Sequence, residues 1–214
     1  MTSIVLNNSS SELPSFRPGL RERQREARDE AILAAAFALL AEKGFEALTM
    51  EAVAERVGIS RQTLYHHFRS KDELVLRAVL TLVEKGILEI EQLDASLPPL
   101  ARLDRIVHWM IELRLAPGPA AIAKARPALL PIKAHPDYKR VFDRRVSVIR
   151  AIVDAGQADG SITPSIPSLL IVHSLLALVC DIRYDELVEM PEVTAKSLVD
   201  NVAQLFVDGI RSRS

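Results

Sequence analysis

The fold is decided by residues 58–74, GISRQTLYHHFRSKDEL, in which a short turn separates two helical patterns. Gly58 can end one helix, and Ser60 can cap the next, which ends near residue 67 or 68. Residues 70–73, SKDE, form a capping box that opens a long helix reaching about residue 93. Two short helices joined by a tight turn are typical of a helix-turn-helix, whose second helix enters the DNA major groove.

Two further helices are expected before this turn. Residues 20–43 have helical apolar spacing, and Gly44 follows as a C-cap glycine. Thr49 can cap a second helix. The apolar side chains of that helix share one face: Met50, Val53, Ala54 and Val57. Residues 20–70 are therefore expected to form a DNA-binding head, after a flexible tail at 1–19 that is rich in Asn, Ser and Pro.

The helix that begins at residue 61 has two chemically different faces. Leu64 and Phe68 are four residues apart and are expected in the core. The opposite face is rich in hydrogen-bond donors and planar groups: Arg61, Gln62, Tyr65 and His66. Arginine suits guanine edges and glutamine suits adenine edges, whereas phosphate contacts set register. This face therefore predicts a recognition surface.

Part of the sequence resembles the recognition segment of the TetR family of repressors. This part comprises residues 44–50, GFEALTM, followed by Val53-Ala54 and residues 58–74. The resemblance implies an all-α fold with an N-terminal three-helix helix-turn-helix DNA-binding head. It also implies a C-terminal helical effector-binding and dimerisation body at residues 71–214. The residues that it implies at a double-stranded DNA operator are Thr49, Ser60, Arg61, Gln62, Thr63, Tyr65, His66 and Lys71. Of these, Ser60 to Thr63 would contact bases, Tyr65 and His66 the backbone, and Thr49 and Lys71 phosphates at helix starts.

A basic run precedes the head: Arg17, Arg21, Arg23, Arg25 and Arg28. It could form an arm that follows the DNA backbone or minor groove. It could equally be a solvated helix start, because acidic residues interleave with the arginines. The sequence leaves both interpretations open.

The body is expected to contain helices at about 100–115, 137–155, 167–184 and 191–210, with a short helix near 120–126. The segment Pro167–Tyr184 is apolar on nearly every side, which predicts burial all round. The family resemblance implies homodimerisation through about Pro167–Tyr184 and Pro191–Ile210. Two-fold symmetry would then require a palindromic operator.

Polar side chains on apolar stripes of the body, together with large side chains of the same helices, are candidates for an effector pocket: Trp109, Met110, Arg114, Phe142, Arg145 and His173. A buried arginine needs a partner, either an anionic ligand group or, more commonly, an internal carboxylate. His173 is more often a core histidine than a ligand contact. The resemblance implies an effector pocket in the body, and we hypothesise that a small, mostly apolar effector, of unknown identity, binds there and tilts the two heads apart.

Composition limits the classes of function. A formal net charge of −1 excludes a globally basic nucleic-acid binder, so DNA binding requires a local basic surface. Cys180 is the only cysteine, which excludes an internal disulfide and fits a reducing cytoplasm. The longest apolar stretch, at 166–180, is shorter than the ~20 residues of a membrane span.

No catalytic motif is found: a Gly-rich phosphate loop, GxSxG, HExxH and CxxC are all absent. His66 and His67 are adjacent and point apart, so no metal site is expected, and no cofactor is predicted. Two alternatives stay open. One is an enzyme using Asp181 and Asp185, and the other is a helical interaction or ligand-binding protein without DNA binding.

Overall fold

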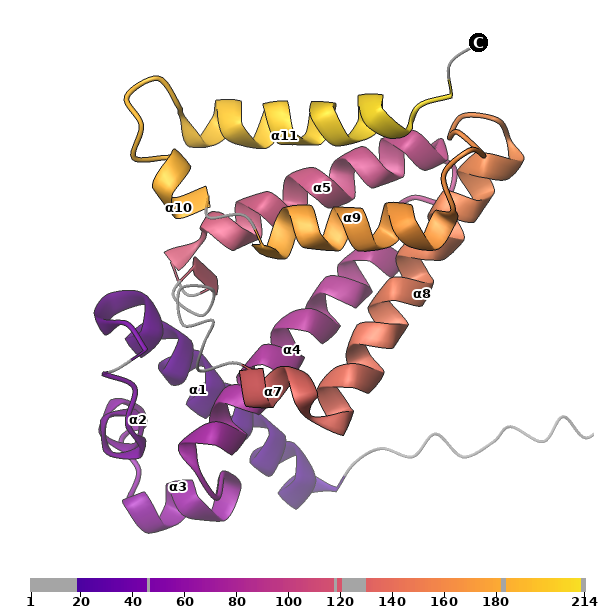
Figure 1. The fold of residues 1–214 in the computed structure, drawn as a ribbon. Helices are drawn as coiled ribbons and strands as arrows, with labels where there is room; N and C mark the ends of the chain where they lie inside the picture. The colour runs from indigo at the N-terminus through magenta and orange to yellow at the C-terminus, as the bar shows by residue number, and fades with distance from the viewer. Residues whose placement is uncertain (1–18, 46, 118, 121–129, 182–183, 213–214) are drawn as a thin grey trace, which may run out of the picture.

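The computed structural model describes residues 19–45, 47–117, 119–120, 130–181 and 184–212 (Figure 1). These residues form helices joined by turns, together with one isolated antiparallel bridge between Ile162 and Arg211. The all-α fold class is therefore confirmed. The helices at the N-terminal end are α1 (Leu20–Lys43), α2 (Met50–Val57), α3 (Arg61–His67) and α4 (Lys71–Glu91).

Caps predicted from the sequence set the ends of these four helices. Gly44 and Gly58 have φ values of 78° and 75°, which a side chain would oppose, and they terminate α1 and α2. The hydroxyls of Thr49, Ser60 and Ser70 accept hydrogen bonds from backbone N–H groups in the first turns of α2, α3 and α4.

The N-terminal helices share one apolar core. Leu64 and Phe68, beside α2 and α1, are almost fully buried, as their spacing predicts. The same core includes Leu74 and Val75 from the first turns of α4, and Ile132 from α7 (Leu130–Ala134). The core that supports α3 therefore continues past residue 70.

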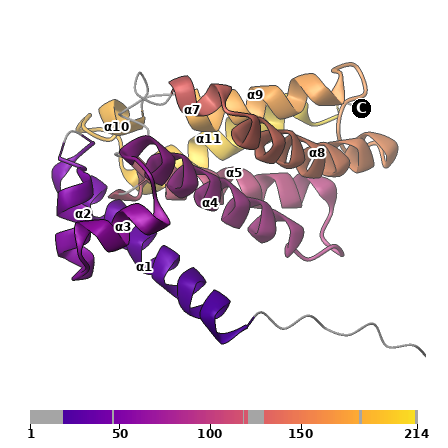
Figure 2. The same cartoon turned by 90° about the horizontal axis from the view of Figure 1, so that it is seen from below.

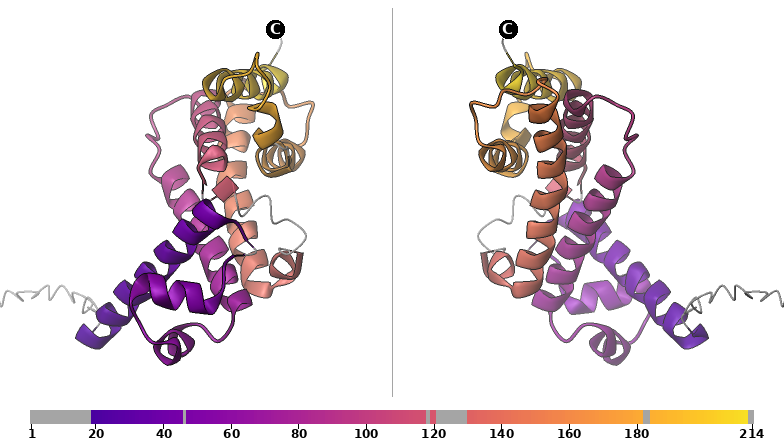
Figure 3. Two further views of the ribbon diagram at one scale, coloured as in Figure 1. Left: turned by 90° about the vertical axis from the view of Figure 1, so that its left-hand side faces the viewer. Right: turned by 90° about the vertical axis from the view of Figure 1, so that its right-hand side faces the viewer.

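The body consists of the second half of α4 and five further helices. Their bounds are α5 (Pro99–Leu115), α8 (Pro136–Ala158), α9 (Ser168–Asp181), α10 (Tyr184–Leu187) and α11 (Ala195–Ile210). The long helix α8 packs on α4, α5 and α9, and α11 packs on α5. Figures 1 and 3 show α2 and α3 at one end of the molecule and α9 and α11 at the other, and Figure 2 shows α4, α5 and α8 between them.

One predicted helix boundary is wrong. The last helix begins at Ala195 rather than at Pro191, because Thr194 and Ser197 form a reciprocal capping box there. The helix predicted at 167–184 is described as α9 up to Asp181 and as α10 from Tyr184, and the two residues between them lie outside the described part of the chain. Most of the short helix expected at 120–126 lies outside the described residues.

Within the described part of the chain, no helix has the length and apolar character that crossing a membrane requires.

Candidate nucleic-acid interface

The helix α3 is held in the head by its inner face. Leu64 and Phe68 anchor it in the apolar core. At its C-terminal end, the Nδ1–H of His67 donates to Asp29 Oδ1 of α1 at 2.5 Å. These contacts fix which side of α3 faces outwards.

The outward face of α3 carries the predicted recognition side chains. Arg61, Gln62 and His66 are exposed, and Tyr65 is 46% exposed. Arg61 Nη1 lies 3.4 Å from Glu51 Oε1, but both side chains are largely in solvent. Such surface pairs contribute little, so Arg61 can exchange this partner for another. The face thus presents donor groups on a short, rigidly supported helix.

Three residues predicted to contact DNA also form hydrogen bonds within the protein. Ser60 Oγ accepts from the N–H of Thr63 at 3.0 Å and lies 2.8 Å from Thr63 Oγ1. Thr49 Oγ1 accepts from the N–H of Ala52 at 3.1 Å. These hydroxyls therefore cap α3 and α2. Their contact with DNA stays a prediction.

The predicted phosphate anchor Lys71 has partners within the protein. Its Nζ donates to the carbonyl oxygen of Phe45 at 3.1 Å and lies 4.4 Å from the centroid of the Phe45 ring. The ammonium group therefore stabilises the turn between α1 and α2. Lys71 is also the first residue of α4, where backbone N–H groups favour an anion.

A second link holds α2 on α1. The two terminal guanidinium nitrogens of Arg56, Nη1 and Nη2, donate to the Glu42 carboxylate at 2.9 and 2.5 Å. This hydrogen bonding lowers the pKa of the Glu42 carboxyl below its ordinary value. The link restricts the angle between the first two helices of the head.

Sequence reasoning missed both links, His67–Asp29 and Glu42–Arg56. His67 lies three residues after Leu64, and this spacing would have placed it on the inner face of α3. Its partner is 38 positions away in the chain, and no local pattern identifies it. Of the basic run, Arg21, Arg23, Arg25 and Arg28 are exposed on α1, whereas Arg17 lies outside the described residues.

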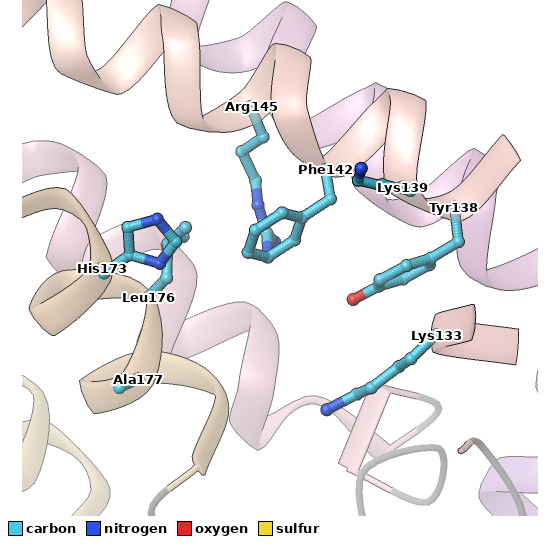
Figure 4. Close-up of a pocket in the computed structure, with 8 residues that line it drawn as sticks. All are labelled: Lys133, Tyr138, Lys139, Phe142, Arg145, His173, Leu176 and Ala177. Carbon is cyan, nitrogen blue, oxygen red and sulfur yellow. The ribbon is translucent and has the colours of Figure 1, made fainter. Parts of the chain in front are cut away.

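A pocket with a volume of about 360 Å³ lies beside α7, α8 and α9 (Figure 4). It brings together three of the predicted effector residues, Phe142, Arg145 and His173. Five other side chains complete its lining: Lys133, Tyr138, Lys139, Leu176 and Ala177. His173 is exposed rather than in the core, and its ring centroid lies 6.2 Å from that of Phe142.

The other three predicted effector residues lie elsewhere. Trp109 lines a smaller cavity of about 140 Å³ beside Ile90 and Arg105. Met110 is buried in the core of the body. Arg114, in the last turn of α5, is not among the residues that line either cavity. Among the described residues, no cluster of three or more His, Cys, Asp or Glu side chains is arranged to hold a metal ion.

The fold and the outward face of α3 define a helix-turn-helix protein with an attached helical body. The family model for bacterial regulatory proteins of the tetR family matches residues 32–78. These residues therefore form a DNA-binding domain of the TetR family, and the protein is a DNA-binding transcriptional regulator.

Similar proteins extend this likeness over most of the chain. It is 25% identical to the transcriptional regulator EthR of Mycolicibacterium smegmatis over 195 residues, which cover 86% of each chain. It is also 25% identical to the regulator RutR of Escherichia coli K12 over 207 residues, covering 91% of this chain and 96% of that one. The solved structure of FadR from Bacillus subtilis with stearoyl-CoA matches this fold with a TM-score of 0.69 at 16% identity. The match covers 85% of this chain and 99% of that one. The last of these shows likeness of fold alone.

Proposed function

We propose that the protein represses transcription by binding a palindromic operator as a homodimer, and that a small effector releases it. The observation that carries this proposal is the outward face of α3. Arg61 and Gln62 are exposed there and can make bidentate contacts with base edges. Tyr65, His66 and the starts of α2 and α4, at Thr49 and Lys71, are placed to contact phosphates.

The exposed apolar side chains of the body support the homodimer. Leu169 and Leu170 of α9 are 45% and 56% exposed, and Leu205 of α11 is 75% exposed. The segment predicted to be buried all round is thus only partly covered by its own chain. A second copy would cover these leucines and place two α3 helices on successive half-sites.

The pocket between α7, α8 and α9 supports the effector. Its volume of about 360 Å³ falls within the usual range for small-molecule sites. The FadR protein of similar fold was solved in complex with stearoyl-CoA, a molecule with a long apolar part. Release from DNA requires that the effector bind the non-DNA conformation more tightly, with a typical coupling of ~1–3 kcal/mol.

This proposal divides the chain into a tail at 1–19, a DNA-binding head at 20–70 and an effector and dimerisation body at 71–214. A regulator of this kind acts where the bacterial chromosome lies, so we place it in the cytoplasm. We assign it no catalytic activity.

A reporter assay tests the proposed mode of regulation. Duplexes that the protein binds are first selected from a random pool, and the enriched site is placed across the promoter of a reporter gene. Expression of the wild-type protein is expected to lower reporter output, whereas Tyr65→Ala and Lys71→Ala variants restore it. Higher output with the wild-type protein would show activation and contradict the proposal.

A further inference from the structure

Arg145 is a buried cation without a counter-charge among the residues that the structure describes. Its side chain extends from α8 into the pocket of Figure 4, and the residue is only 8% exposed. Among the described residues, its Nε has no hydrogen-bond partner, and it forms no ion pair. Its guanidinium carbon lies 5.1 Å from the centroid of the Phe142 ring. Burial of an unpaired guanidinium is costly, and a cation–π contact offsets only part of that cost.

The charges around Arg145 do not neutralise it. Lys133 and Lys139 line the same pocket, and no carboxylate is among the described lining residues. Among the described residues, the internal carboxylate expected for Arg145 is therefore not found, and the described lining of the pocket carries an excess of positive charge.

The rest of the lining is apolar or aromatic. Phe142 and Tyr138 of α8 lie on one side of the pocket, with ring centroids 6.1 Å apart, and Leu176 and Ala177 of α9 lie on the other. Such a surface suits a hydrocarbon or aromatic group. The two lysines are exposed at the rim, so the buried charge of Arg145 is the group that would select among ligands.

We infer that the effector is an amphipathic organic anion whose carboxylate or phosphate pairs with Arg145 while its apolar part covers Phe142 and Leu176. This inference rests on the proposed effector-responsive regulation and specifies the effector's chemistry. A guanidinium binds either anion through two parallel hydrogen bonds, and such charge-assisted bonds are among the strongest in proteins.

A first experiment needs no ligand. Arg145→Met removes the buried charge and keeps an apolar side chain of similar length, so the melting temperature of the ligand-free protein is expected to stay level or rise. Arg144→Met is the matched control: Arg144 is the next residue on α8, is exposed and pairs with Glu91 at 3.0 Å. A fall in melting temperature for Arg145→Met that clearly exceeds that of Arg144→Met would show an internal partner and overturn the inference.

A second experiment uses three probes with one hydrocarbon chain: decanoate, decyl phosphate and the neutral decan-1-ol. Calorimetric titration of the wild-type protein is expected to show at least one anion binding about tenfold or more tightly than the alcohol. Arg145→Met should remove that preference, and Arg144→Met should retain it. The better of the two anions identifies a carboxylate or a phosphate effector. Equal binding of all three probes, no binding of either anion, or an unchanged preference in Arg145→Met would each overturn the inference.

Operator binding of the same variants separates this inference from the proposed function. Arg145→Met is expected to bind the selected operator like the wild-type protein but to resist release by the anion. Operator binding by a protein that ignores both anions would overturn the inference and leave DNA-binding regulation intact. Anion binding through Arg145 without any operator binding would leave the pocket assignment standing and contradict the proposed repression.

Discussion

The Nδ1 of His67 and the Oδ1 of Asp29 lie 2.5 Å apart, and this hydrogen bond joins the end of α3 to the middle of α1. Both side chains are mostly shielded from solvent. The bond lies inside the head, on the side of α3 opposite to Arg61 and Gln62. The orientation of the recognition face therefore depends on residues that do not reach DNA.

Replacement of His67 by Ala is expected to lower the free energy of unfolding by about 1–2 kcal/mol, because a part-buried hydrogen bond to a charged group is lost. Operator affinity should fall for all sequences alike, since α3 becomes less well fixed. Urea denaturation and fluorescence anisotropy measure the two effects. In a double-mutant cycle with Asp29→Asn, strict additivity would show that the two side chains do not interact.

Two substitutions of Ser60 distinguish its role as a helix cap from its predicted contact with DNA. Ser60→Ala is expected to cost about 1 kcal/mol of stability through loss of the cap on α3. Ser60→Asp keeps a capping oxygen and should retain stability, but its charge would repel nearby phosphates and weaken operator binding. Denaturation and anisotropy on both variants provide the check. Wild-type operator affinity in Ser60→Asp would place this end of α3 away from DNA.

Lys71 is expected to contribute to binding through phosphate contact. The logarithm of the operator binding constant falls linearly with the logarithm of the salt concentration. Lys71→Ala should make this slope less negative by ~0.9. Lys85→Ala is the matched control, because Lys85 is an exposed lysine in the same helix α4. Anisotropy titrations over a range of salt concentrations measure the slope. An unchanged slope in Lys71→Ala would restrict Lys71 to its contacts with Phe45.

The Glu42–Arg56 link predicts a pH dependence of stability. The hydrogen bond from Arg56 lowers the folded-state pKa of Glu42 below its ordinary 4.5. The link therefore stabilises the folded state above pH 4.5, and this stabilisation is lost as the pH falls through the lowered pKa. Glu42→Gln should be less stable than wild type near neutral pH, and the difference should shrink in acid. A difference that stays constant from pH 7 to pH 3 in chemical denaturation would contradict the prediction.

Leu205 tests the proposed dimer. Leu205→Glu places a charge on the exposed apolar side of α11 and is expected to shift the protein towards monomer in sedimentation experiments. Leu88→Glu is the matched control, since Leu88 is also an exposed leucine but lies on α4. Operator affinity should fall with the loss of the dimer. Equal sedimentation of the two variants would exclude this side of α11 from the interface.

The head could be predicted closely because its determinants are local. Gly44, Gly58 and the capping residues Thr49, Ser60 and Ser70 lie at the helix ends that they set. The buried and exposed faces of α3 follow from the four-residue spacing of Leu64 and Phe68. Local patterns of this kind require no knowledge of the tertiary structure.

The effector pocket could be predicted only in part because it forms from separate helices. Helical spacing placed Phe142 and Arg145 on one face of α8, but it could not show that Lys133 from α7 joins them. It also predicted both Trp109 and His173 as pocket residues, although the structure places them in different cavities. Which helices meet is a tertiary property, and here it decides the composition of the pocket.

We propose that the outward face of α3 reads the operator. Selection from a random duplex pool, run in parallel with the wild-type protein and an Arg61→Ala/Gln62→Ala variant, tests this role of α3. We expect the wild-type protein to enrich a palindrome. The double variant is expected to lose preference at specific positions in each half-site, with each lost pair worth ~1–3 kcal/mol of discrimination. The same motif with the same base preferences from both proteins would show that Arg61 and Gln62 do not read the operator.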